Sequence, residues 1–317
     1  MAQKPKTVGT SNTQSYLEES DLQFLRHLRF VPRVRIEGAY IGKHQSPLRG
    51  QSQEFTDYRD YSPGDEIRRI DWKVYGRTDR HIIKLSEQET VLTCYLMLDS
   101  SASMAFGGRS YEDYFGAEDV SKFDYAGRLA AALAFLIVQQ GDKVGLTLFD
   151  AQVRCHLPAG GTFAHLHRLL AMLQSNRAGR KTHLIEALRQ AYALLPRRGV
   201  LILISDLLDD PEDLFEALDM YRHRNFEIIL FHVMHQHELE LPQLTSINFI
   251  DAESGERLTS IPADIRKTYD QELNGFLEQV RTIAASRRMD YELMSTAIGP
   301  YAALEQYLGR RSQRWGC

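Results

Sequence analysis

The sequence predicts an α/β protein with a doubly wound, mostly parallel β-sheet. Apolar segments that suit buried strands alternate along the chain with longer segments whose apolar residues recur at helical spacing. Two of the apolar segments, residues 93–98 and 200–205, are each followed at once by an acid, as expected of central strands that end at a ligand-binding edge. The 317 residues leave room for one such domain of about 200 residues and a smaller piece.

The amino-terminal part is expected to precede this domain. Residues 1–16 are polar and lack the apolar centre of a secretory signal, so we expect a loose tail there. Leu22, Leu25 and Leu28 fall on one helical face and predict a short helix within residues 19–30. The expected organisation is a flexible tail over 1–18, an N-terminal extension over 19–89, the main domain over 90–311 and a short tail over 312–317.

The main domain is expected to alternate strands and helices. Residues 121–140 are apolar over most of their length and are followed by Gly141, which predicts a buried helix. Residues 143–149 and 153–157 predict two strands joined by a turn at Asp150–Gln152. The other expected elements are helices at 162–174, 183–195, 211–223, 263–287 and 299–310, strands at 200–205, 226–234 and 290–294, and a small hairpin within 245–261 with Ser254–Gly255 in its turn.

Composition argues against several classes of function. Hydrophobic residues make up 43% of the chain and charged residues 25%, which is ordinary for a globular protein, and a net charge of −4 argues against a binder of nucleic acid. The longest apolar run, residues 129–138, falls short of the roughly 20 residues that span a bilayer. Three separated cysteines without a C-x-x-C pair indicate free thiols. We expect a cytoplasmic protein without a membrane span, whose basic residues near the carboxyl end form a solvated helix end, namely Arg310, Arg311 and Arg314.

An acid and two serines follow the first of the two strands. Asp99, Ser101 and Ser103 form a D-x-S-x-S motif directly after the apolar run. Mg²⁺ is a small, hard cation that prefers six oxygen ligands and is usually held by one or two carboxylates, so one acid and two hydroxyls suit it. The same residues also suit a plain turn, because Asp and Ser favour turns and helix starts. This segment alone leaves both interpretations open.

Two later segments supply further oxygen atoms. Thr182 lies in a polar loop before a segment with helical apolar spacing, and Asp206 follows the second apolar strand. Because the carboxyl ends of parallel strands share one edge of a sheet, we expect Asp99 and Asp206 to meet at that edge. We expect the same edge to be the surface that binds a partner.

The order and spacing of five residues resemble the metal-ion-dependent adhesion site of von Willebrand factor A-type domains. These residues are Asp99, Ser101, Ser103, Thr182 and Asp206. The resemblance implies that the three hydroxyls bind Mg²⁺, or Mn²⁺ or Ca²⁺ in its place. It also implies that the acids act directly or through water, and that a carboxylate of a partner completes the coordination shell. Gly often follows the second acid in that family, whereas Leu207 stands here, a departure that bears on the backbone of the loop.

A second resemblance covers the segment before the first strand. Residues 54–80 interleave aromatic side chains with seven acids and six bases, a near balance that predicts local ion pairing and aromatic packing. The segment is similar to the signature of the bacterial domain-of-unknown-function family 58, through Gly50, Glu54-Phe55, Arg59-x-Tyr61-x-Pro63-Gly64-Asp65, Arg68-x-Ile70-Asp71-Trp72 and Arg77. The resemblance implies a von Willebrand factor A-like domain after the signature. It also implies an association with MoxR-type AAA+ ATPases as an adaptor or in chaperone-like assembly, without an established catalytic activity.

Together these patterns favour a non-catalytic, metal-dependent interaction module that works with a MoxR-type AAA+ ATPase or its client. One alternative is a metal-dependent phosphohydrolase, since Mg²⁺ can polarise a phosphoryl oxygen, although the matched residues include no obvious general base. A second alternative is a scaffold that binds through the aromatic segment without a metal. His232, His235 and His237 raise a zinc site, but no cysteine accompanies them and a solvated loop is the preferred interpretation.

Overall fold

Two compact units make up the chain, one of residues 1–33 and 92–317 and the other of residues 34–91. The larger unit includes α1 (Glu19–Leu25), whereas the sequence predicts residues 19–89 as one extension. The computed structural model describes residues 16–33, 57–62, 65, 67, 70–85, 91–107, 120–179, 183–195, 198–242, 247–250, 257–260 and 262–315.

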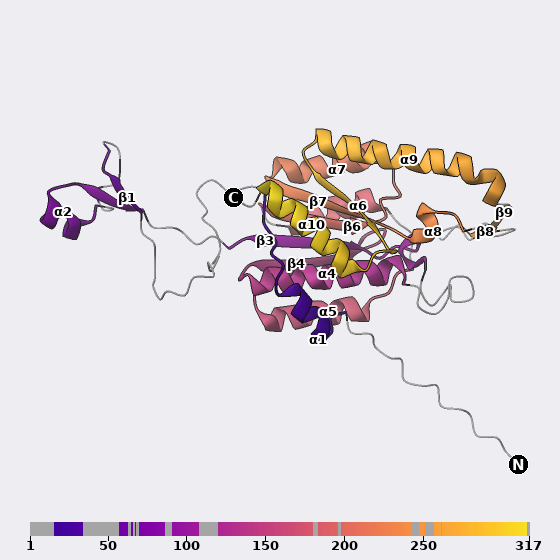
Figure 1. Ribbon diagram of the computed structural model, residues 1–317, viewed down its shortest axis with the longest axis horizontal. Helices are drawn as coiled ribbons and strands as arrows, with labels where there is room; N and C mark the ends of the chain where they lie inside the picture. The colour runs from indigo at the N-terminus through magenta and orange to yellow at the C-terminus, as the bar shows by residue number, and fades with distance from the viewer. Residues whose placement is uncertain are drawn as a thin grey trace, which may run out of the picture. The chain divides into compact units, whose positions relative to one another are not determined.

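A six-stranded sheet in the order β10-β7-β6-β3-β4-β5 forms the centre of the larger unit (Figure 1). Its strands are β3 (Thr93–Asp99), β4 (Lys143–Phe149), β5 (Val153–Gly160), β6 (Gly199–Ser205), β7 (Phe226–Met234) and β10 (Asp290–Ser295). All neighbouring pairs are parallel except β4 and β5, which pair antiparallel with shifts in register at one edge of the sheet. The predicted α/β class with a mostly parallel sheet is confirmed.

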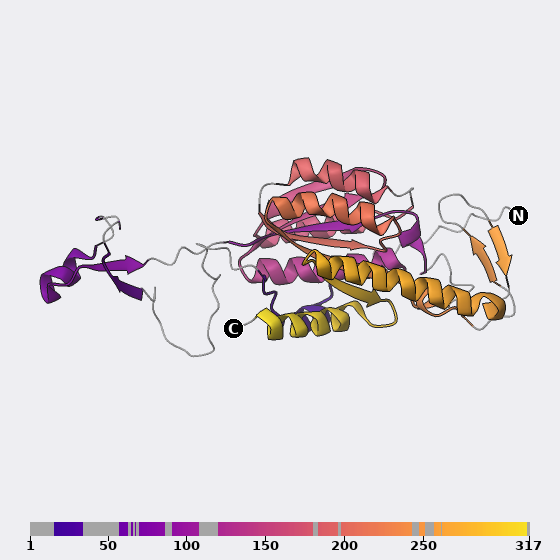
Figure 2. The same cartoon turned by 90° about the horizontal axis from the view of Figure 1, so that it is seen from above.

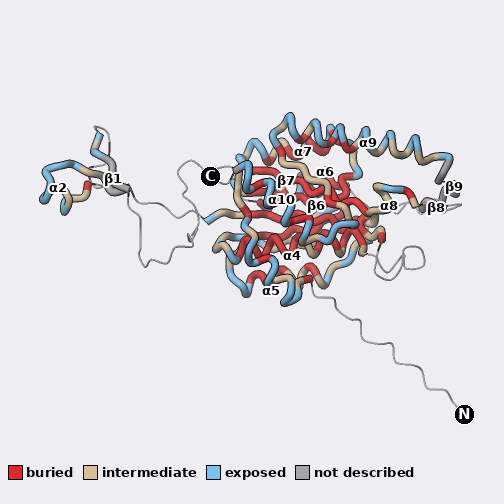
Figure 3. Tube along the Cα trace, in the orientation of Figure 1, coloured by how far each residue is buried: buried red, intermediate tan, exposed pale blue. Residues whose placement is uncertain are grey.

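Helices cover both faces of this sheet (Figure 2). Side chains of β3 alternate between the two hydrophobic clusters, with Leu96 and Leu98 in one and Tyr95 and Met97 in the other, because successive strand residues point to opposite faces. Buried residues therefore concentrate in the sheet and on the inner sides of the helices (Figure 3). The first cluster includes α1, α4 (Lys122–Gln139), α5 (Phe163–Ser175) and α10 (Pro300–Trp315), and the second includes α6 (Leu184–Leu194), α7 (Pro211–His223) and α9 (Pro262–Ser286).

The helix α4 is buried along most of its length because it lies between the sheet and the helices α5 and α10. The Ser121 hydroxyl caps its start by accepting a hydrogen bond from the Asp124 N–H. The chain leaves the helix through Gly141, whose φ of +84° lies in the left-handed region that favours glycine. Within the described residues, no helix is long and apolar enough to cross a membrane.

Most predicted elements are found with small shifts at their ends. The edge strand β5 continues to Gly160, α1 ends at Leu25, and α10 continues to Trp315, into the stretch predicted as a tail. The strands β8 (Ile247–Ile250) and β9 (Arg257–Ser260) pair antiparallel where a hairpin is expected. Its turn at Ser254–Gly255 lies outside the described residues. Among the described residues of the larger unit, two short elements are not predicted, the 3-10 helix η2 (Ser103–Ala105) and the helix α8 (Gln236–Leu239).

The prediction of a solvated basic end of the last helix is wrong for Arg311. This side chain is only 1% exposed and makes ion pairs with Glu227 and Asp290, while its Nε donates a hydrogen bond to the Val31 carbonyl at 2.6 Å. Arg310 keeps to the prediction, since half of its side chain is exposed. Neighbouring residues of a helix face different directions, so adjacent arginines can have opposite environments.

The smaller unit contains a two-stranded antiparallel sheet of β1 (Asp57–Asp60) and β2 (Ile82–Leu85) and the helix α2 (Trp72–Thr78). Asp71 caps α2 by accepting hydrogen bonds from two N–H groups of its first turn. The predicted aromatic packing is present, with the Tyr75 ring 5.9 Å from Trp72 and 4.5 Å from His81 between ring centroids. Pro63 and Gly64 of the family signature lie outside the described residues.

Candidate functional site

Asp99 stands at the carboxyl end of β3 with both carboxylate oxygens engaged. Its Oδ1 accepts a hydrogen bond from the Ser101 N–H at 2.8 Å, and its Oδ2 accepts one from the Ser205 hydroxyl at 2.6 Å. The side chain is buried, so these bonds fix its orientation. Burial and then the charge of Asp206 raise the pKa of Asp99 to about 7, although the hydrogen bonds from Ser205 and Ser101 oppose the rise.

The two serines of the motif lie together beside Asp99. The hydroxyl oxygens of Ser101 and Ser103 are 3.0 Å apart, and either can donate to the other. Ser100, between Asp99 and Ser101, is used differently, since its hydroxyl donates to the Phe149 carbonyl on β4. The structure therefore places the alternate residues of D-x-S-x-S in one group.

Asp206, the second predicted acid, follows β6 on the same edge of the sheet. Its Oδ2 accepts a hydrogen bond from the Lys122 ammonium at 2.8 Å, and the same ammonium lies 2.7 Å from Oε1 of Glu238. Burial opposes the positive charge of Lys122, but Asp206 and Glu238 outweigh it and raise the pKa of the lysine. Neither Lys122 nor Glu238 is predicted from the sequence.

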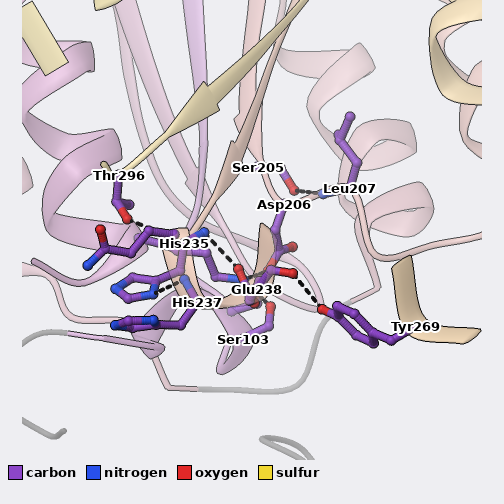
Figure 4. Close-up of polar contacts among 12 residues, drawn as sticks. Ser103, Ser205, Asp206, Leu207, His235, His237, Glu238, Tyr269 and Thr296 are labelled. Atoms are coloured by element: carbon purple, nitrogen blue, oxygen red, sulfur yellow. Dashed lines mark hydrogen bonds and ion pairs between the residues drawn. The ribbon is translucent and has the colours of Figure 1, made fainter. Parts of the chain in front are cut away.

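Leu207 takes an unusual backbone conformation directly after Asp206. Its φ of +50° lies in the left-handed region, although its buried side chain belongs to the hydrophobic core. Its N–H donates to the Ser205 hydroxyl at 3.1 Å (Figure 4). That hydroxyl in turn donates to Asp99. The leucine thus adopts a conformation that suits the glycine often found here in von Willebrand factor A-type domains.

Thr182 lies outside the described residues, so its place at the site stays a prediction. Gly179 before it and Leu184 after it each donate a hydrogen bond to a residue that follows a strand at the carboxyl edge of the sheet. The Gly179 N–H donates to the Ser100 carbonyl at 3.3 Å, and the Leu184 N–H donates to Oδ2 of Asp209 at 3.2 Å. Both ends of the segment that holds Thr182 are therefore anchored to residues close in sequence to Asp99 and Asp206.

The helix α8 borders the site through Glu238, as Figure 4 shows. The Oε2 atom of Glu238 accepts a hydrogen bond from the His235 N–H at 2.8 Å, and its carbonyl accepts one from the Tyr269 hydroxyl at 2.6 Å. The Gln236 N–H donates to the Thr296 hydroxyl at 3.0 Å. These bonds hold α8 between the end of β7, the long helix α9 and the turn after β10.

The predicted solvated loop of histidines is wrong, since His232 lies within β7 and both His232 and His235 are buried. Burial lowers the pKa of His232 to about 4, and its Nδ1 lies 2.9 Å from the Tyr291 hydroxyl. The Nδ1 atom of His235 accepts a hydrogen bond from the His237 N–H at the start of α8. The described part of the chain holds no group of three or more His, Cys, Asp or Glu residues that could bind a metal, so the zinc alternative gains no support.

The chemistry of the donor set fits a hard divalent cation. Two carboxylates and two hydroxyls come together at one edge of the sheet, and oxygen ligands of this kind are those that Mg²⁺ prefers. The Lys122 ammonium contacts two carboxyl groups, those of Asp206 and Glu238, and the buried Asp99 carboxyl lies near enough to Asp206 for the charge of Asp206 to raise its pKa. A cation bound beside Asp99 would favour the ionised form of this carboxyl, which burial and the charge of Asp206 oppose.

The six-stranded, mostly parallel sheet between two helical layers defines a doubly wound α/β domain. Residues 57–275 match the family described as "Protein of unknown function DUF58", and the chain belongs to this family. Uncharacterized proteins of Mycobacterium bovis and Mycobacterium tuberculosis are 30% identical to it over 237 residues, which cover 73% of this chain and 70% of theirs.

Solved structures are similar to this chain at lower sequence identity. A conserved hypothetical protein BatB from Bacteroides thetaiotaomicron is 16% identical with a TM-score of 0.44, over 70% of this chain and 99% of that one. The SpRpn10 VWA domain is 12% identical with a TM-score of 0.36, over 70% of this chain and 96% of that one.

Proposed function

We propose that this chain is a non-catalytic interaction module whose site at the carboxyl edge of the sheet holds a divalent cation. The observation that carries the proposal is the meeting of two buried acids, Asp99 and Asp206, with the hydroxyls of Ser101 and Ser103 at one edge of the sheet. Mg²⁺ is the expected ion, with Mn²⁺ or Ca²⁺ as alternatives that the same oxygen atoms would accept.

The residues of the site would divide their roles by chemistry. The hydroxyls of Ser101, Ser103 and Thr182 would bind the cation directly, and the carboxylates of Asp99 and Asp206 would hold it directly or through water. The bound cation would supply an open coordination position for a carboxylate of a partner protein. Asp99 accepts one hydrogen bond on each carboxylate oxygen, so both oxygen atoms keep a lone pair that could bind the cation.

The proposed partner is a MoxR-type AAA+ ATPase or its client, in keeping with the family resemblance, and the proposed compartment is the cytoplasm. Two exposed apolar side chains would add contact surface at the same edge of the sheet. Leu208 follows β6 and is 61% exposed, and Ile298 follows β10 and is 43% exposed. Since β6 and β10 are parallel members of one sheet, both side chains follow strand ends on the edge that holds Asp206.

The decisive experiment is a calorimetric titration of Mg²⁺ into the full chain and into its Asp99→Asn variant. Asn keeps the shape of the side chain and an oxygen for the Ser101 N–H, but it removes one negative charge from the cation site. We expect the variant to bind Mg²⁺ at least about tenfold more weakly, because ligand charge is a main determinant of affinity in such sites. Capture of a purified MoxR-type ATPase in Mg²⁺ should weaken in parallel.

Asp210→Asn is the matched control. Asp210 caps α7 on the same edge of the sheet, and Asn caps a helix about as well, so this variant loses the same charge without touching the site. Equal Mg²⁺ binding by the parent and Asp99→Asn would contradict the proposal. Turnover of an aryl phosphate with Mg²⁺ that depends on Asp99 would instead favour the phosphohydrolase alternative.

A second candidate function is a scaffold that binds through the smaller unit. It is favoured by Trp72 and Ile67, which are 57% and 62% exposed although large apolar residues usually pack inside. Trp72→Ala belongs in the same capture experiment. Loss of the ATPase in this variant, with capture unchanged in Asp99→Asn, would assign binding to the smaller unit.

A further inference from the structure

Lys122 brings a buried positive charge to the proposed cation site. Its ammonium lies 2.8 Å from Oδ2 of Asp206 and 2.7 Å from Oε1 of Glu238, and its side chain is 1% exposed. The lysine belongs to the first turn of α4, Asp206 follows β6, and Glu238 belongs to α8. One ammonium group therefore joins three elements that are far apart in the sequence.

The helix α8 also contacts the other half of the site. The ring of His235, which caps α8, packs edge-on against Phe106 with their centroids 5.0 Å apart. Phe106 directly follows η2, whose first residue is Ser103. A Cβ added at Gly107 would lie 2.8 Å from the His235 ring, so the backbone there approaches α8 closely. The cap residue of the short helix thus touches the residues that follow the D-x-S-x-S motif, and Glu238 of the helix shares the Lys122 ammonium with Asp206.

We propose that Lys122 competes with the divalent cation for Asp206, and that the outcome is passed to α8 through Glu238. This inference rests on the proposed function, because it presupposes that a cation binds beside Asp206. Two cations that share one carboxylate repel each other, and the repulsion is strong where water is excluded. Cation binding therefore weakens the ion pair between Lys122 and Asp206.

Thermodynamic linkage makes this competition reciprocal. If the cation weakens the ion pair, the ion pair must weaken cation binding by the same factor. Lys122 retains Glu238 as a partner when its hold on Asp206 is loosened, so the contacts of α8 change with the occupancy of the site. The surface of α8 would then differ between the cation-bound and cation-free protein, which gives a partner a way to distinguish them.

Two variants test the competition with opposite expected signs. Lys122→Met removes the competing charge while keeping an unbranched apolar side chain, and we expect it to bind Mg²⁺ about tenfold more tightly than the parent. Glu238→Gln removes one of the two carboxylates that pair with the Lys122 ammonium, so the ammonium pairs more strongly with the other, Asp206. We expect this variant to bind Mg²⁺ more weakly than the parent. Calorimetric titration of the full chain measures both changes.

Hydrogen exchange tests the transmission to α8. The N–H groups of Glu238 and Leu239 both donate to the His235 carbonyl within this helix. Addition of Mg²⁺ should change their exchange rates in the parent chain and leave them unchanged in Lys122→Met. Lys143→Met is the matched control, since it removes the same charge from an exposed lysine at the start of β4.

The results separate this inference from the proposed function. Mg²⁺ binding that is lost in Asp99→Asn but unchanged in both Lys122→Met and Glu238→Gln would overturn the competition and leave the cation site standing. Binding by Lys122→Met but not by the parent would support the competition in its strongest form. Absence of binding in every variant would overturn both proposals. If Lys122→Met does not fold, Glu238→Gln and the paired variant Lys122→Met with Glu238→Gln carry the test.

Discussion

Asp99 and Leu207 show how single residues set the geometry of the site. The Leu207 N–H donates to the Ser205 hydroxyl, and the Ser205 hydroxyl donates to Asp99, so the backbone after β6 helps to orient a carboxylate on β3. This arrangement requires Leu207 to hold its positive φ. A residue other than glycine pays a steric penalty of about 1 kcal/mol in that region.

At Leu207 we therefore expect glycine to destabilise the protein less than alanine, the reverse of the usual order. Leu207→Ala loses the buried side chain and keeps the strained backbone, so we expect it to lower the free energy of unfolding by about 3 kcal/mol. Leu207→Gly loses the same packing but relieves the strain, and we expect it to be about 1 kcal/mol more stable than the alanine variant. Denaturant unfolding of both variants measures the difference.

The comparison with another buried leucine provides the control. At Leu188, in the interior of α6, glycine should be less stable than alanine, as is usual within a helix. If the glycine variant is less stable than the alanine variant at Leu207 as well, the result would contradict the backbone strain assigned to Leu207.

The sequence predicts part of this site and misses the rest for definite reasons. Asp99 and Asp206 could be placed at one edge because each ends an apolar strand, and parallel strands share an edge. Glu238 has no local signal, since only the packing of α8 brings it to Asp206. Lys122 has a weak local signal. It is a cation in the first turn of a predicted apolar helix, where the helix dipole disfavours positive charge.

At the scale of elements, Arg311 connects α10 to the sheet and to the segment that follows α1 through ion pairs and a hydrogen bond. Its ion pairs reach Glu227 on β7 and Asp290 on β10, and its Nε binds the Val31 carbonyl. The guanidinium also lies 5.1 Å from the centre of the Phe30 ring. One side chain therefore joins two strands of the sheet, the last helix and the amino-terminal segment.

Loss of this arginine should destabilise the larger unit strongly. Arg311→Met leaves Glu227 buried without its cation, and we expect the free energy of unfolding to fall by about 3 to 5 kcal/mol. Adding Glu227→Gln should restore part of the loss, because it removes the unpaired charge. Arg310→Met is the neighbouring control, and its half-exposed ion pair with Glu292 should contribute less than about 1 kcal/mol. Similar losses in the two single variants would refute the role of Arg311.

The elements themselves were predictable wherever apolar periodicity extends over a full strand or several helical turns. The strands β3, β6 and β7 and the helix α4 are of this kind. The elements η2 and α8 were missed because three or four residues show no period. The place of β10 beside β7 was not predicted, since strand order depends on pairings distant in sequence.

At the scale of the whole molecule, Asp142 links stability to pH. Burial raises the pKa of this carboxyl to about 6, although a hydrogen bond from the Leu92 N–H opposes the rise. Between about pH 4 and pH 6 the folded chain therefore keeps a proton that the unfolded chain releases. The contribution of Asp142 to stability is complete below this range and is lost as the pH rises through it.

Asp142→Asn should remove this dependence. The amide has no proton to lose and its oxygen can still accept from the Leu92 N–H, so the variant should match the parent near pH 3.5. At pH 7 we expect it to be about 1 kcal/mol more stable, a value reduced for solvent screening of a partly exposed group. Denaturant unfolding at both pH values measures the two differences, and a constant difference would contradict the raised pKa.

The edge strand β5 has a consequence for the behaviour of the protein at high concentration. An open sheet edge with free N–H and C=O groups can recruit strands from other molecules and start aggregation. In β5 the exposed Pro158 has no N–H to offer, and the pairing with β4 shifts in register between Val144 and Leu146. This border of the sheet is therefore a poor template for intermolecular β-pairing, which protects the folded chain from growth into fibrils along that side.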